Sequence, residues 1–153
     1  MKTLSAAIGV SALSIAVLGC RHQDDGSFSH LSPMGFTIRL PAGWELSSTL
    51  ASPRTDYFAP AESERLYPPL SIRVLPDETS DLEQLAEQPA SRELTVGGEK
   101  AVMLPSTEPV LQRFVYLQHG SDLWEVRWIF EPDSVEEDES VLEDILASFR
   151  FTD

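Results

Sequence analysis

The sequence predicts an α+β fold made mainly of short antiparallel strands. Apolar and polar residues alternate from Phe36 to Leu40, the period-two pattern of a half-buried strand. Glycine-containing turns at residues 97–98 and 119–121 each separate two strand-like runs, as in β-hairpins. Short amphipathic patterns at residues 80–88 and 141–146 favour helices. The chain of 153 residues, 42% hydrophobic and 24% charged, suits a single globular domain.

A short hydrophobic leader opens the chain. Met1 to Thr3 give a basic start, and Leu4 to Leu18 form an apolar run broken only by small Ser and Gly. A helix of this length spans about 22 Å, less than the roughly 30 Å hydrocarbon core of a bilayer. The run is therefore short for a membrane span, and we expect residues 1–19 to be a signal peptide.

The only cysteine, Cys20, ends this leader. The segment Val17-Leu18-Gly19-Cys20 resembles the lipobox of bacterial lipoproteins. The resemblance implies cleavage before Cys20 and acylation of Cys20, for example with palmitate, and two or three acyl chains would anchor the protein firmly. In enterobacterial lipoproteins an Asp after the cysteine retains the protein at the inner membrane, so with Arg21 at that position the resemblance implies the outer membrane, with the domain in the periplasm. Cleavage without lipid, a free thiol and an intermolecular disulfide are the alternatives.

The net charge of −14 limits the partners of the chain. Because nucleic-acid binding depends on Lys and Arg that neutralise phosphates, we expect no nucleic-acid partner. Anionic lipid headgroups should also repel the domain, so its membrane contact is expected through the lipid anchor. Solubility is the simplest interpretation of the charge, and a basic protein partner is the alternative.

Residues 20–33 are polar and lack periodicity, so we expect a flexible tether that carries the lipidated Cys20. His22 and His30 lie in it and are poor metal-ligand candidates, because a mobile tether holds a metal weakly. The folded domain is expected at residues 34–153. Strands are predicted at residues 36–40, 56–59 and 70–74, with a turn at 41–43 and a Ser- and Pro-rich loop over the rest of 47–69.

Two helices are predicted from their start signals. The segment Ser80-Asp81-Leu82-Glu83 is typical of a capping box in which Ser80 begins a short helix that ends near Gln88, before Pro89. Asp133 or Ser134 is expected to cap the last helix, whose early turns are acidic and so complement the helix dipole. Its apolar stripe contains Val141, Leu142, Ile145 and Leu146, and residues 148–151 close the chain as an extended segment.

The hairpin that joins residues 110–118 to 122–130 has two different faces. Opposite residues of an antiparallel pair share a face, so its positions separate into two sets. The core face contains Leu111, Arg113, Val115, Leu117, Trp124, Val126, Trp128 and Phe130, with Arg113 expected over Trp128. We expect the mixed face either to lie under a helix or to be exposed to a partner. Its candidate partner surface is Phe114, Tyr116, Glu125 and Arg127.

The two ends of the domain resemble those of the PsbP-like superfamily. Residues 35–44, Gly-Phe-Thr-Ile-Arg-Leu-Pro-Ala-Gly-Trp, resemble its opening strand, and residues 141–151 resemble its closing helix followed by Ser-Phe-x-Phe. The superfamily includes the photosystem PsbP subunit, bacterial DcrB-like lipoproteins and a eukaryotic Ran-binding protein. The resemblance covers about residues 34–152. It implies an antiparallel sheet of about six strands flanked by helices in an α/β/α sandwich, and non-catalytic members that bind or stabilise other proteins.

No catalytic or metal-binding motif is recognisable in the sequence. His119, Ser121 and Asp122 have triad residue types, but adjacent turn residues do not easily place the histidine between nucleophile and acid. The acids at residues 131–139 lack the ligand order and the glycine of an EF-hand, which favours a solvated helix start over a calcium site. Trp44, Trp124 and Trp128 are more typical of a core than of a ligand box. We therefore expect no catalytic residue, cofactor or metal.

These observations favour a membrane-anchored periplasmic lipoprotein that binds or assembles an envelope protein. An immunity-like protein whose acidic surface neutralises a basic toxin is a special case of this hypothesis. The alternative is a carrier lipoprotein that holds a small ligand or metal with the Pro-rich loop and the aromatic face. An enzyme is the third hypothesis, and we do not expect one.

Overall fold

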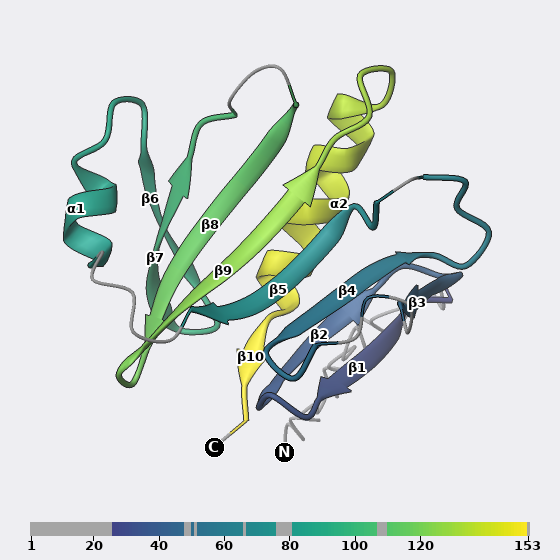
Figure 1. Cartoon of the computed structure of the whole chain (residues 1–153), viewed down its shortest axis with the longest axis horizontal. Helices are drawn as coiled ribbons and strands as arrows, with labels where there is room; N and C mark the ends of the chain where they lie inside the picture. The colour runs from purple at the N-terminus through teal and green to yellow at the C-terminus, as the bar shows by residue number, and fades with distance from the viewer. Residues whose placement is uncertain are drawn as a thin grey trace, which may run out of the picture.

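The computed structural model describes residues 26–47, 50, 52–65, 67–75, 81–106 and 110–152. These residues form two antiparallel sheets and two helices (Figure 1). The predicted signal peptide, Cys20, His22 and the first part of the tether lie outside the described residues. Within the described ranges, no helix combines the length and the apolar character needed to cross a membrane.

The larger sheet has seven strands in the order β3-β4-β5-β9-β8-β7-β6. β8 and β9 pair along their whole length around a two-residue turn, with Val115 opposite Val126 and His119 opposite Asp122. This register confirms the predicted division of the hairpin into two faces. The strands are β3 (Trp44–Leu46), β4 (Thr55–Pro60), β5 (Leu70–Leu75), β6 (Arg92–Val96), β7 (Glu99–Leu104), β8 (Gln112–His119) and β9 (Asp122–Ile129).

The smaller sheet has three strands in the order β1-β2-β10, which are β1 (Phe28–Ser32), β2 (Phe36–Leu40) and β10 (Arg150–Phe151). β1 corrects the predicted tether, because residues 28–32 pair with β2 and belong to the folded domain. The sequence lacks an apolar alternation there, since the inward-facing residues His30 and Ser32 are polar and Leu31 is 65% exposed. The α+β class is confirmed, and the larger sheet of seven strands agrees with the expected sheet of about six, whereas the separate three-stranded sheet was not expected.

The two helices lie on opposite faces of the larger sheet. α2 (Val135–Ser148) shares one face with the smaller sheet and contacts β2 (Figure 1). α1 (Leu82–Ala86) lies on the other face, where its Leu82 and Leu85 pack near Val102 and Leu123. Asp81, rather than the predicted Ser80, caps α1 by accepting a hydrogen bond of 2.8 Å from the Gln84 N–H. Aspartate is as effective at this position as serine, so the helix begins one residue later; Ser80 lies outside the described residues.

The main core lies between the larger sheet and the layer formed by α2 and the smaller sheet. The predicted core face of the hairpin supplies Val115, Leu117, Trp124, Val126, Trp128 and Phe130, and α2 supplies Leu142, Ile145 and Leu146. Trp128 is fully buried, and its ring lies 5.4 Å from that of Trp44, so these tryptophans belong to the core as expected. Arg113 differs from the prediction, because its guanidinium lies over Phe130 at 5.8 Å and pairs with Glu139.

Candidate functional site

The candidate partner surface predicted from the sequence is brought together on the face of the larger sheet opposite the main core. Phe114 of β8 lies directly across from Arg127 of β9, and Tyr116 lies across from Glu125. Arg73 of β5 is in turn paired with Glu125. We call these five residues, Arg73, Phe114, Tyr116, Glu125 and Arg127, the outer-face cluster.

Glu125 is the buried centre of the outer-face cluster. Its side chain is 2% exposed, and both of its carboxylate oxygens accept hydrogen bonds. The Arg73 guanidinium donates Nε–H to Oε1 at 2.8 Å and Nη2–H to Oε2 at 3.0 Å, and the Tyr116 hydroxyl donates to Oε2 at 2.9 Å. The hydrogen bond to Glu125 raises the pKa of Arg73, whereas partial burial acts in the opposite direction. A carboxylate so fully engaged orients its neighbours and is not exposed to a partner.

Arg73 was missed by the sequence reasoning. Its position between Ile72 and Val74, which are core-facing residues of an alternating strand, indicates that it points to the opposite face. The partner of β5, however, is β9, which lies about 50 residues further along the chain, and no local pattern reveals that pairing. The side chain of Arg73 is 45% exposed, so it also presents charge at the surface.

Phe114 and Arg127 form the other half of the outer-face cluster. The Phe114 ring stacks nearly parallel to that of Tyr116, with centroids 6.1 Å apart and an interplanar angle of 14°. Arg127 is half-buried, and its Nε has no hydrogen-bond partner among the described residues. α1 covers only the neighbouring part of this face, where it packs near Tyr116 and Leu123. The alternative that this face lies under a helix therefore applies to the part beside α1, and the alternative that it meets a partner stays a prediction for the rest.

The residues with triad-like chemistry are arranged differently from a catalytic triad. His119 bonds to Glu99 at 2.9 Å and stacks on Phe151, with ring centroids 3.7 Å apart, so it is held at the end of β8, beside the hairpin turn. A second group joins β1 to β4: the Ser32 hydroxyl donates to Asp56 at 2.5 Å, and His30 Nε2 lies 3.9 Å from the same oxygen. In a triad the histidine lies between serine and acid, whereas here the serine contacts the acid directly and is 2% exposed.

The acidic start of α2 is joined to a basic residue. Ser134 occupies the predicted N-cap position, but its side chain makes no capping hydrogen bond. Asp138 instead accepts a hydrogen bond of 3.1 Å from the Glu131 N–H, and Arg65 pairs with Glu131 at 2.6 Å and with Asp138 at 3.5 Å. No set of three or more ligating side chains in the described part of the chain is grouped to hold a metal ion.

The order of the strands and the helix on each face of the larger sheet define an α+β sandwich. No family model and no curated protein matches the sequence. Among solved structures, the cyanobacterial PsbP protein CyanoP from Synechocystis sp. PCC 6803 superposes with a TM-score of 0.57 at 13% identity, covering 97% of this chain and 98% of CyanoP. The domain is therefore PsbP-like in fold, as its two ends indicated.

Two further structures are similar over most of this chain. A protein from Bacteroides thetaiotaomicron VPI-5482 has a TM-score of 0.55 at 12% identity, covering 84% of this chain, which spans 49% of that protein. LpqN, involved in cell envelope biogenesis of Mycobacterium tuberculosis, has a TM-score of 0.47 at 16% identity, with 83% and 91% of the two chains covered. At 12% identity the likeness to the Bacteroides protein concerns the fold alone.

Proposed function

We propose that the protein is a non-catalytic protein-binding module of the bacterial envelope, anchored to the outer membrane through lipid on Cys20. The outer-face cluster is the observation that supports binding. Aromatic residues and arginines are enriched at the centres of protein interfaces, and this surface combines Phe114 and Tyr116 with Arg73 and Arg127. The pair between Arg73 and Glu125 fixes the geometry of the cluster, so little side-chain freedom is lost on binding.

The partner expected at this surface is a protein with an apolar contact flanked by acidic groups. Phe114 and Tyr116 supply a stacked apolar surface. Arg127 is half-buried and adds a guanidinium charge next to Phe114, with which a carboxylate of the partner would pair in a charge-assisted hydrogen bond. The sequence also carries a formal net charge of −14, so the arginines of this cluster are a local exception to the acidic character of the whole.

Site-specific photo-crosslinking in the native host tests the binding proposal. A photoreactive phenylalanine analogue at Phe114 is expected to give one discrete adduct, and the same analogue at exposed Ser140 on α2 is the matched control. In a second experiment the analogue is placed at Tyr57 of β4, which lies on the same face beyond β5 and β9, and the added substitution Phe114→Ala should reduce the adduct formed there. Equal labelling at positions 114 and 140, or no adduct at either, would count against the outer-face cluster as a binding surface.

The anchor is tested separately by the substitution Cys20→Ser. The unaltered protein should sediment with outer-membrane vesicles and incorporate labelled palmitate, whereas the Cys20→Ser variant should do neither. If the unaltered protein retains residues 1–19 or lacks the label, the lipoprotein part of the proposal fails. The outer-face result is independent of this outcome, because it depends only on the folded domain.

A further inference from the structure

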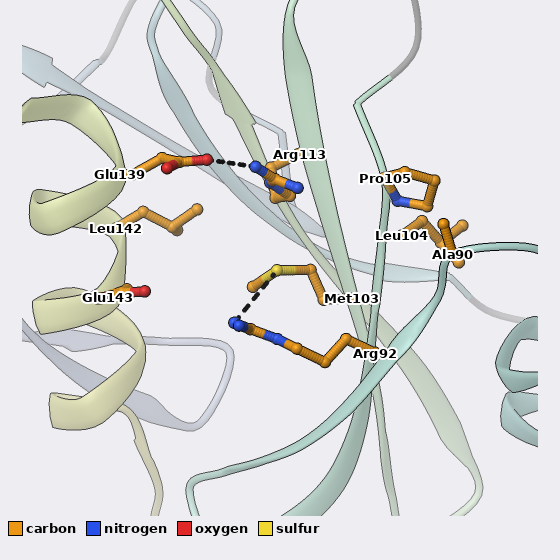
Figure 2. Close-up of a pocket in the computed structure, with 9 residues that line it drawn as sticks. All are labelled: Ala90, Arg92, Met103, Leu104, Pro105, Arg113, Glu139, Leu142 and Glu143. Atoms are coloured by element: carbon orange, nitrogen blue, oxygen red, sulfur yellow. Dashed lines mark hydrogen bonds and ion pairs between the residues drawn. The ribbon is translucent and has the colours of Figure 1, made fainter. Parts of the chain in front are cut away.

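A cavity of about 230 Å³ opens between α2 and the strands β6 to β8 (Figure 2). Met103 and Leu142, which are 8% and 3% exposed, supply much of its apolar wall. Leu104 and Pro105 extend this wall at one side, and Ala90 lies beside them (Figure 2). The cavity lies on the other side of the larger sheet from the outer-face cluster, because Met103 alternates with the outward-facing Val102.

Two guanidinium groups line the cavity, and their environments differ. Arg113 is neutralised by its ion pair with Glu139 of α2 and lies over the Phe130 ring. Arg92 extends from β6 across the cavity toward α2 (Figure 2). Its one hydrogen bond joins Nη2–H to the Met103 sulfur at 3.7 Å, and a thioether is a weak acceptor. Arg92 thus has unused donors beside an apolar wall, with no carboxylate partner among the described residues.

The carboxylates near Arg92 do not neutralise it. Glu143 lines the same cavity but forms no ion pair with Arg92, and Glu139 is engaged by Arg113. Glu93, the next residue along β6, pairs instead with Lys100 at 3.8 Å. Among the described residues, five arginines form no ion pair with a carboxylate, and Arg92 is the one of these five that lines this cavity.

The backbone that leads into Arg92 is strained. Ala90 has φ of 61° and is the one non-glycine with positive φ among the described residues. Such a conformation costs about 1 kcal/mol or more and persists where surrounding contacts impose it. Here the Ser91 N–H bonds to the Gln88 carbonyl at 3.1 Å, and the Ser91 hydroxyl bonds to the Ala86 carbonyl at 2.6 Å. These two bonds fix the turn that places Ala90 at the cavity and begins the strand carrying Arg92.

We propose that this cavity binds a small organic monocarboxylate, with the carboxylate on Arg92 and a short apolar body against Met103 and Leu142. A guanidinium matches a carboxylate in geometry and charge. The volume is below the roughly 300–1,000 Å³ of cavities for drug-sized ligands, so a short-chain or single-ring acid fits best. The site differs from the carrier hypothesis based on sequence, because neither the Pro-rich loop nor the aromatic face lines it.

Methionine-methyl NMR gives a direct test of this site. The sequence has three methionines, of which Met103 lines the cavity and Met34 packs elsewhere against the core. With the protein labelled at its methionine methyl groups, hexanoate should shift the Met103 signal saturably and leave the Met34 signal in place. 1-Hexanol, which has the same apolar body without the charge, should bind about tenfold more weakly or worse.

Variants at Arg92 separate recognition of the charge from general apolar binding. Arg92→Gln should weaken hexanoate binding about tenfold or more, and Arg92→Lys, which keeps the charge, should lose less. Arg54→Gln is the matched control, since Arg54 is exposed next to β4, far from β6 in the strand order. The Met34 signal reports whether each variant is folded. An unmoved Met103 signal, equal binding of hexanol, or undiminished binding by folded Arg92→Gln would overturn the proposal.

Discussion

Arg73 of β5 and Glu125 of β9 form a bidentate ion pair whose two partners differ sharply in burial. The Glu125 side chain is 2% exposed, whereas that of Arg73 is 45% exposed. A buried charge that loses its partner carries the full penalty of its desolvation, but a half-exposed charge is largely solvated by water. The two residues should therefore respond unequally to substitution.

Arg73→Met is expected to lower the free energy of unfolding by about 2 kcal/mol, because it leaves the buried Glu125 carboxylate with only the Tyr116 hydroxyl. This value lies below the range for fully buried pairs because water reaches Arg73. Glu125→Gln should cost about 1 kcal/mol, since the amide keeps one acceptor and the guanidinium turns to solvent. Urea unfolding measures both. Arg54→Met is the control, and a larger cost for Glu125→Gln than for Arg73→Met would contradict the argument.

The stabilisation by this pair should not depend on pH in the neutral to alkaline range. The hydrogen bond to Glu125 raises the pKa of Arg73 above its ordinary value, so the guanidinium is protonated in the folded and unfolded states alike below that ordinary value. The contribution is lost only as pH rises through the raised folded-state pKa. The difference in unfolding free energy between the unaltered protein and Arg73→Met should be constant from about pH 7 to about pH 9. A steady decline across this range would refute the assignment.

Ser32→Ala should weaken the attachment of β1 to the larger sheet. The Ser32 hydroxyl donates to Asp56 and accepts the Met34 N–H at 3.0 Å, and both Ser32 and Asp56 are buried. Removal of the hydroxyl leaves the buried Asp56 carboxylate without this donor, which should lower the free energy of unfolding by about 1–3 kcal/mol. Amide hydrogen exchange of residues 28–32 should accelerate in parallel. Ser29 is an exposed neighbour in β1, so Ser29→Ala should change neither the free energy of unfolding nor the exchange rate of residues 28–32. Equal effects of the two substitutions would exclude this role for Ser32.

The part of the candidate site that sequence reasoning predicted is the part governed by local alternation. The two strands of the β8–β9 hairpin are adjacent in the chain, and a short turn sets their register. Phe114, Tyr116, Glu125 and Arg127 were therefore assigned to one face, and the structure confirms it. Their burial was not predictable, because Glu125 is enclosed by Arg73 from a strand more distant in the sequence.

The features that the sequence did not reveal depend on contacts between distant segments. β1 has no apolar alternation, and it is held by pairing with β2 and by the bond from Ser32 to Asp56. Arg113 was expected on Trp128, its cross-strand neighbour, but Glu139 on α2 draws it toward Phe130. The cavity at Arg92 likewise needs β6 and α2 side by side, which neither segment indicates alone.

Gly97 and Gly120 give a matched pair for separating backbone strain from steric overlap. Both lie in hairpin turns, with φ of 62° and 59°, so a change to alanine strains each backbone by about 1 kcal/mol. A Cβ at Gly97 would also lie 3.1 Å from the ring of buried Phe149 and 3.4 Å from its carbonyl oxygen, whereas one at Gly120 would meet nothing within 4 Å. Gly97→Ala should therefore lower the free energy of unfolding by about 1–3 kcal/mol more than Gly120→Ala, because a close-packed core yields little. Urea unfolding of the two variants decides the matter, and equal losses would show that Phe149 moves aside freely.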